Sequence, residues 1–148
     1  MKVKLVANSE HYSDLARELE RHGIEIDENA GLVLQETDAF TSCLICKKDN
    51  ELHRISTEDI IFIESLNHDV LVHTERGVFR AGERLWRLSN LLNPKEFLRI
   101  SNSVIAARSH IKSIKPALSQ KFILTMSDGN RVDVTRTYYY VFRESLGI

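Results

Sequence analysis

The chain has 148 residues, enough for one domain of ordinary size or for one domain with a short appendage. Hydrophobic residues make up 43% and charged residues 28% of it, a composition that is typical of a folded soluble protein and excludes a disordered tail. No apolar run approaches the roughly 20 residues of a membrane-spanning helix. The N-terminus also lacks the apolar core of a signal peptide, so we expect a cytoplasmic protein without membrane insertion.

Positive and negative charges are unevenly distributed along the chain. Residues 1–98 contain 12 Lys and Arg residues against 18 Asp and Glu residues, whereas residues 99–148 contain 8 against 3. A region with excess positive charge attracts a polyanion even when the whole protein is slightly acidic. Because such an asymmetry also occurs on surfaces that face only solvent, charge alone does not decide for nucleic-acid binding.

The first 39 residues predict a small α+β unit in the order strand, helix, strand, strand (βαββ). Residues 2–7 have the pattern of a short strand, and a helix follows from Asn8 or Ser9 to about Arg21. Two further short strands are predicted at 24–26 and 32–34. This unit is too small to hold a full core alone, so we expect it to pack on the remainder of the chain.

Residues 40–148 predict a mostly antiparallel β domain with short helices, because short strand patterns recur every eight to twelve residues with polar turns between them. An apolar stripe predicts a helix over 83–92, ended by Asn93-Pro94. The stretch from Tyr138 fits either a helix or a strand. The predicted strands are 40–47, 52–56, 60–64, 70–73, 78–80, 111–114, 122–126 and 131–134.

Motifs of enzymes and of metal sites are absent from the sequence. It contains no phosphate-binding glycine loop, no nucleophile elbow and no paired histidines at metal-binding spacing. The one cluster to weigh is Cys43, Cys46 and His53, but a single C-x-x-C pair is a weak zinc signal. Cysteines three apart in a strand also point to opposite faces. We therefore expect no metal, no cofactor and no enzymatic activity.

The segment 97–114, FLRISNSVIAARSHIKSI, combines an apolar pattern with short polar and basic side chains. Such side chains bind phosphates, and an exposed asparagine can pair with the edge of adenine in the major groove. Serine and asparagine also cap turns between strands, and the spacing alone fits both interpretations.

A second candidate lies in VDVTR, residues 132–136, where Arg136 follows an alternating strand. An arginine at a strand end can bind guanine or a phosphate with two hydrogen bonds. The alternative is a surface arginine paired with Asp133 or with solvent.

Three sequence blocks together resemble the DNA-binding domains of the LytTR family. They are STEDIIFIES at 56–65, FLRISNSVIAARSHIKSI at 97–114 and FILTMSDGNRVDVTRTYY at 122–139, and the resemblance extends from about residue 40 to residue 148. It implies an elongated β fold that reads successive major grooves through loops, typically with paired domains on direct repeats. The first 39 residues lie outside the resemblance and do not look like a complete receiver domain.

The resemblance also implies which residues contact DNA. The asparagine position of the family falls on Asn102 and the arginine position on Arg136. The histidine position falls in the loop after Ser65, where His68 is the nearest candidate and Asn67 or Asp69 are alternatives. Contacts to the DNA backbone are implied for Arg99, Ser101, Ser103, Arg108 and Lys112. One departure is the triplet Ile105-Ala106-Ala107, where family members commonly carry I-V-N.

The resulting prediction is a sequence-specific DNA-binding regulator with double-stranded DNA as partner. We expect a homodimer on direct repeats, with residues 1–39 serving dimerisation or regulation. The alternative is a non-catalytic protein-interaction module that kept the fold but lost specific DNA binding, for instance one that binds a membrane protein. Its one support in the sequence is the departure at Ala106-Ala107. The sequence does not identify the target genes or the controlling signal.

Overall fold

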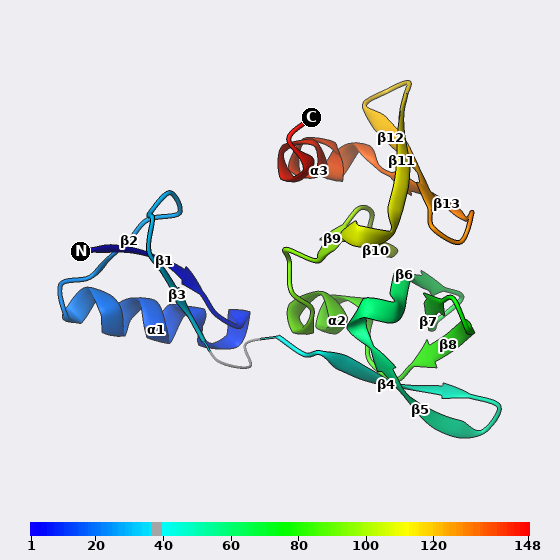
Figure 1. Cartoon of the computed structure of the whole chain (residues 1–148), viewed down its shortest axis with the longest axis horizontal. Helices are drawn as coiled ribbons and strands as arrows, with labels where there is room; N and C mark the ends of the chain where they lie inside the picture. The colour runs from blue at the N-terminus through cyan, green and yellow to red at the C-terminus, as the bar shows by residue number, and fades with distance from the viewer. Residues whose placement is uncertain (37–39) are drawn as a thin grey trace. The chain divides into compact units, whose positions relative to one another are not determined.

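The computed structural model describes residues 1–36 and 40–148, which form two compact units, Met1–Thr41 and Ser42–Ile148 (Figure 1). The expected junction between residues 39 and 40 adjoins the gap, and residue 39 lies outside the described residues. None of the helices in the described part of the chain is long and apolar enough to cross a membrane.

The N-terminal unit is a three-stranded parallel sheet with one helix. Its elements are β1 (Lys2–Val6), α1 (Ser9–Arg21), β2 (Glu25–Ile26) and β3 (Val33–Gln35), and the strand order is β2-β1-β3. The helix begins after Asn8, whose side chain accepts a hydrogen bond from the Glu10 amide at 2.9 Å. Among its described residues, only Val3 and Leu5 are buried hydrophobic side chains, and α1 contributes none. The unit therefore has a very small core of its own.

An ion pair joins the start of α1 to the residue after β3. His11 Nδ1 lies 2.6 Å from Glu36 Oε1, and the Asn8 amide donates to Glu36 Oε2 at 3.1 Å. The hydrogen bond with Glu36 raises the pKa of His11 above its ordinary value of 6.5. The same bond, with the amide of Asn8, lowers the pKa of Glu36 below 4.5.

These shifts predict a pH dependence of the stability of this unit. The contribution of His11 to the stability of the unit is complete below pH 6.5, and it disappears as the pH rises through the raised pKa of His11. The contribution of Glu36 to stability is complete above pH 4.5, and it disappears as the pH falls through the lowered pKa of Glu36. The thermal midpoint of the wild type should therefore exceed that of Glu36→Gln most at about pH 5.5, and less at about pH 9. An advantage equally large at both pH values would contradict this.

The second unit contains a seven-stranded antiparallel sheet and a three-stranded antiparallel sheet. The strand orders are β5-β4-β8-β7-β6-β10-β9 and β11-β12-β13. The first sheet is built from β4 (Cys43–Lys48), β5 (Glu51–Ser56), β6 (Ile60–Leu66), β7 (Asp69–Thr74), β8 (Gly77–Ala81), β9 (Phe97–Arg99) and β10 (Val104–Ala107). The second comprises β11 (Ile111–Ala117), β12 (Lys121–Met126) and β13 (Arg131–Val134). The prediction of a mostly antiparallel β domain with short helices is confirmed.

Two helices complete this unit, α2 (Leu85–Leu91) and α3 (Tyr139–Leu146), and each closes a core. In the first core, the leucines of α2 pack on side chains of the seven-stranded sheet such as Val72 and Ile105. In the second core, the three-stranded sheet and Phe142 of α3 pack on the opposite face of the seven-stranded sheet. A register irregularity between Ile60 and Phe62 directs both Ile61 and Phe62 into the second core.

Two details differ from the sequence prediction or resolve it. The segment 97–107, for which the sequence analysis predicts no strand, forms β9 and β10. The C-terminal stretch, which fits either structure by its pattern, is helical because Phe142 and Leu146 share the face that packs on the second core. Gly147 ends this helix with φ of 69°, the left-handed conformation of a C-cap.

Candidate nucleic-acid interface

Three loops of the second unit lie at one end of the seven-stranded sheet. The antiparallel pairing of β10 with β6 sets Val104 beside Glu64, so the β9–β10 loop adjoins the β6–β7 end. The Ser65 amide also donates to the Ser103 carbonyl at 2.8 Å. The segment after β13 joins them, because the Thr135 amide donates to the Ile100 carbonyl at 2.9 Å. Long-range strand pairing thus brings together three turns that are far apart in the sequence.

Asn102 lies exposed at the tip of the β9–β10 loop, and its neighbours hold the loop in one conformation. The Arg99 guanidinium donates to the carbonyl of Ser101 at 2.7 Å and to that of Asn102 at 2.6 Å. The Ser101 side chain is buried, and its Oγ accepts from the Ser103 amide at 3.2 Å. Arg99 and Ser101 therefore shape this loop, and Asn102 and Ser103 face solvent.

Arg136 opens a short 3-10 helix, η3 (Arg136–Tyr138), one residue after the end of β13, and is exposed. Within residues 1–36 and 40–148, no ion pair includes Arg136. Arg136 is therefore not paired with Asp133. Its guanidinium is therefore available to an external anion or base edge.

His68 occupies the tight turn between β6 and β7. Asn67 and His68 both have positive φ, 50° and 73°, as a type I′ hairpin turn requires. His68 is exposed. Asp69 instead opens β7 and forms an ion pair with Arg80 at 3.6 Å. Of the three alternatives, His68 and Asn67 project from the turn and Asp69 is engaged by a neighbouring strand.

A surface hollow of about 640 Å³ unites Asn102 and Arg136. Two further cations, Lys121 and Arg131, also line it, as do the acids Glu64 and Asp133. Glu64 Oε1 already forms a short contact of 2.8 Å with His73 Nε2. The remaining lining residues are Ser101, Ser103, Val104, Val132, Thr135 and Thr137; His68 is not among them.

Comparisons with known proteins match the fold of the second unit. Residues 50–147 match the family model described as the LytTr DNA-binding domain. The chain belongs to this LytTR family. It is 27% identical to a solved LytTr DNA-binding domain of a Bacillus cereus response regulator, with a TM-score of 0.70 over 73% of this chain and 99% of that one.

Among curated proteins, the chain is similar to the transcriptional regulatory protein LytR of Staphylococcus aureus strain N315. The identity is 28% over 123 residues, which cover 82% of this chain and 50% of that protein. It is also 31% identical over 94 residues to the sensory transduction protein LytT of Bacillus anthracis, covering 64% of this chain and 38% of that one. The chain thus spans at most about half the length of these relatives.

Not all the residues that the LytTR resemblance implies lie together. Arg108 follows the far end of β10, and its guanidinium donates to the Ser145 carbonyl of α3 at 2.9 Å. Lys112 lies next to the Ile111–Met126 pair, whereas the opposite end of β12 carries Lys121. The structure therefore does not bring Arg108 or Lys112 to the Asn102 loop.

The sequence analysis does not single out Lys121 and Arg131, which line this hollow. The alternation of β13 does predict that Arg131 and Asp133 face away from the core, as they do. The sequence contains no signal that this face adjoins the Asn102 loop, because that depends on how the two sheets pack.

The departure from the LytTR pattern at Ala106-Ala107 leaves β10 regular. Ala106 pairs with Leu98 and Ala107 with Phe97, and both alanines are buried. The next residue continues the pairing, since the Arg108 amide donates to the Glu96 carbonyl at 2.7 Å. The altered triplet is therefore accommodated without a disturbed strand.

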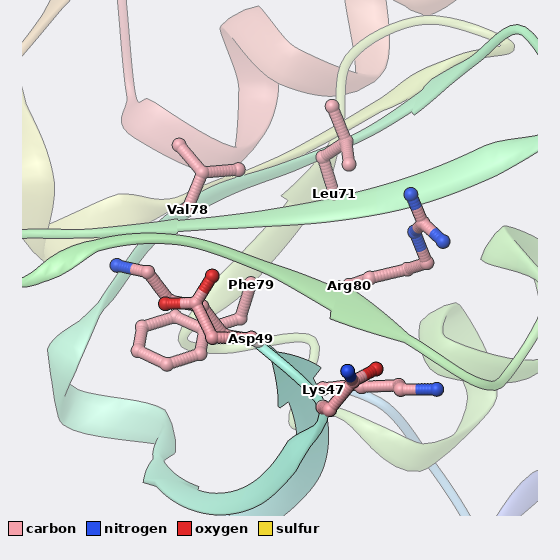
Figure 2. Close-up of a pocket in the computed structure, with 8 residues that line it drawn as sticks. Lys47, Asp49, Leu71, Val78, Phe79 and Arg80 are labelled. Atoms are coloured by element: carbon pink, nitrogen blue, oxygen red, sulfur yellow. The ribbon is translucent and has the colours of Figure 1, made fainter.

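A second hollow, of about 370 Å³, lies over β4, β7 and β8, and Figure 2 labels Lys47, Leu71, Val78 and Arg80 among the residues that line it. The Lys48 ammonium lies 5.0 Å from the centre of the Phe79 ring. Arg80 is engaged by Asp69. We find no nucleophile paired with a base among the described residues of this hollow.

The cysteine cluster weighed in the sequence offers no zinc site in the described residues, where no three His, Cys, Asp or Glu side chains gather. Cys46 is buried in the first core, and burial raises the pKa of its thiol to about 11. A thiol with such a pKa is a poor source of the thiolate that zinc requires.

Proposed function

We propose that this chain is a sequence-specific DNA-binding transcription regulator that reads major grooves with the loop side chains His68, Asn102 and Arg136. The observation that carries the proposal is the hollow that Asn102 and Arg136 share at one end of the sheet. The asparagine amide matches the adenine edge, and the arginine fork matches guanine. His68 projects from the adjoining β6–β7 end. The proposal includes a cytoplasmic location and no enzymatic activity.

Phosphate contacts would supply most of the affinity and make it depend on salt. Ser103, Lys121 and Arg131 border the hollow and are the side chains that we assign to the backbone next to the bases. Arg99 and Ser101 would act mainly by holding the loop. The contacts predicted for Arg108 and Lys112 stay predictions for phosphates farther along the duplex.

We further propose that the protein binds direct repeats as a homodimer, with the N-terminal unit as the dimerisation element. Support comes from β3, an edge strand preceded by Leu32 whose apolar side chains are exposed. The exposed fractions are 57% for Leu32, 53% for Val33 and 45% for Leu34. Residues 30–35 carry no charge in an otherwise strongly charged unit, so a second copy of this edge is a suitable partner.

Analytical ultracentrifugation of the full chain tests the dimer. We expect a dimer for the wild type and a monomer for the double variant Leu32→Glu, Leu34→Glu, because two negative charges on the same face of the edge strand in each copy oppose its pairing. A monomeric wild type at micromolar concentration would count against the dimer but not against DNA binding.

Selection of bound sites from random DNA with the purified chain tests the regulator proposal directly. We expect one enriched motif, repeated once, with single mismatches costing about 1 to 3 kcal/mol each. Affinity for the motif should fall linearly in a double-logarithmic plot against salt. The alternative, a protein-interaction module that kept the fold, predicts that no motif is enriched above random DNA.

A further inference from the structure

The Asn102 amide makes a side-chain hydrogen bond with the segment that carries Arg136. The Tyr138 hydroxyl donates to Asn102 Oδ1 at 3.2 Å. Tyr138 ends the η3 turn that Arg136 begins, and its ring packs against the second core. A partly buried ring thus extends from the core to the exposed amide of the other loop.

This bond restrains the rotation of the Asn102 amide about its last side-chain torsion. Rotation by about 180° about the last side-chain torsion of asparagine exchanges its oxygen with its NH₂ group. In the structure the phenol hydroxyl donates to Oδ1, so Oδ1 is the amide atom that faces Tyr138. The oxygen keeps a second lone pair, so the amide still has both the donor and the acceptor that the adenine edge needs.

The backbone of the same loop is fixed independently, through the two hydrogen bonds from the Arg99 guanidinium. These bonds restrain the backbone of the loop, but they do not restrict the rotation of the Asn102 side chain. A fixed amide loses less conformational entropy on binding than a rotating one, so its orientation contributes directly to base preference.

We propose that Tyr138 is a positioning residue that orients the Asn102 amide for base reading and links it to the Arg136 turn. The inference rests on the proposed function, since it assigns a role within the same base-reading site. Tyr138 needs no contact with DNA, and its hydroxyl acts through Asn102.

The test measures base preference in the full-length protein. The probe is the highest-affinity duplex selected from random DNA by the wild type, with every single-base-pair variant of it. Asn102→Ala first identifies the base pair that Asn102 reads, as the position where discrimination is lost. Tyr138→Phe should then lower discrimination about threefold to tenfold at that base pair and at no other. The salt slope and the affinity for random DNA should match the wild type.

Tyr140→Phe is the matched control, because the Tyr140 hydroxyl accepts a hydrogen bond from Gln120 Nε2 at 2.8 Å and does not contact Asn102. This variant should keep the full preference at every position. If Tyr138→Phe keeps the preference that Asn102→Ala loses, or loses it equally at all positions, the positioning role is overturned and base reading by Asn102 stands. If Asn102→Ala itself relaxes no position, the base-reading assignment fails, and the role of Tyr138 fails with it.

Discussion

Replacing both Asn102 and Arg136 by alanine is expected to remove most of the sequence preference and to leave the protein folded. Each side chain should contribute about 1 to 3 kcal/mol of discrimination. If the two losses add, the double variant should therefore bind the selected site about 30-fold to 20,000-fold more weakly. The two residues line one hollow, so the combined loss can be smaller than the added single losses.

Salt dependence separates the two roles in the single variants. Arg136→Ala removes a charge and should lower the salt slope by about 1, whereas Asn102→Ala should leave the slope unchanged. Both side chains are exposed, so the thermal midpoint should stay near that of the wild type.

Arg54→Ala is the matched charge control, since Arg54 is exposed on β5, at the opposite edge of the seven-stranded sheet from β9. It should leave the preference intact. Fluorescence anisotropy with the selected duplex and with random DNA gives both quantities. Wild-type preference in the double variant would contradict the assignment of these residues.

Replacing Phe142 by alanine should cost about 3 to 5 kcal/mol in the free energy of unfolding. The Phe142 side chain is 1% exposed, and its ring centre lies 5.5 Å from that of Phe122 in the second core. Truncation leaves a cavity that the two packed sheets cannot easily close. Because α3 directly follows η3, the same change should loosen the Arg136 turn and weaken specific binding.

Urea unfolding measures the loss of stability. Val141→Ala is the control, because Val141 lies on the same helix but is 64% exposed, and it should change stability by about 0.5 kcal/mol or less. A loss for Phe142→Ala no greater than that for Val141→Ala would show that α3 does not depend on this contact.

Much of the fold was predictable, because many of its strands and turns depend on local sequence patterns. Alternation of apolar and polar residues defines strands such as β7 and β12, and the turn at 127–130 lies where glycine and polar residues interrupt the pattern. The segment 97–107 escaped assignment because β9 and β10 are short and buried, so they lack that alternation. The C-terminal stretch stayed ambiguous because aromatic residues suit strands and helices alike, and packing of Phe142 decided it.

The sequence by itself determined the β class and the LytTR resemblance, because these depend on residue types and short spacings. It also predicted Asn102 and Arg136 as the leading candidate side chains. The tertiary structure alone decided which residues meet. Strand order and register place Lys121 and Arg131 in the hollow that Asn102 lines, let Arg99 and Ser101 bond to the loop backbone, and leave Arg108 at the other end of β10. The physical reason is range: side-chain periodicity acts over a few residues, whereas the meeting of two loops requires pairings between strands far apart in the chain.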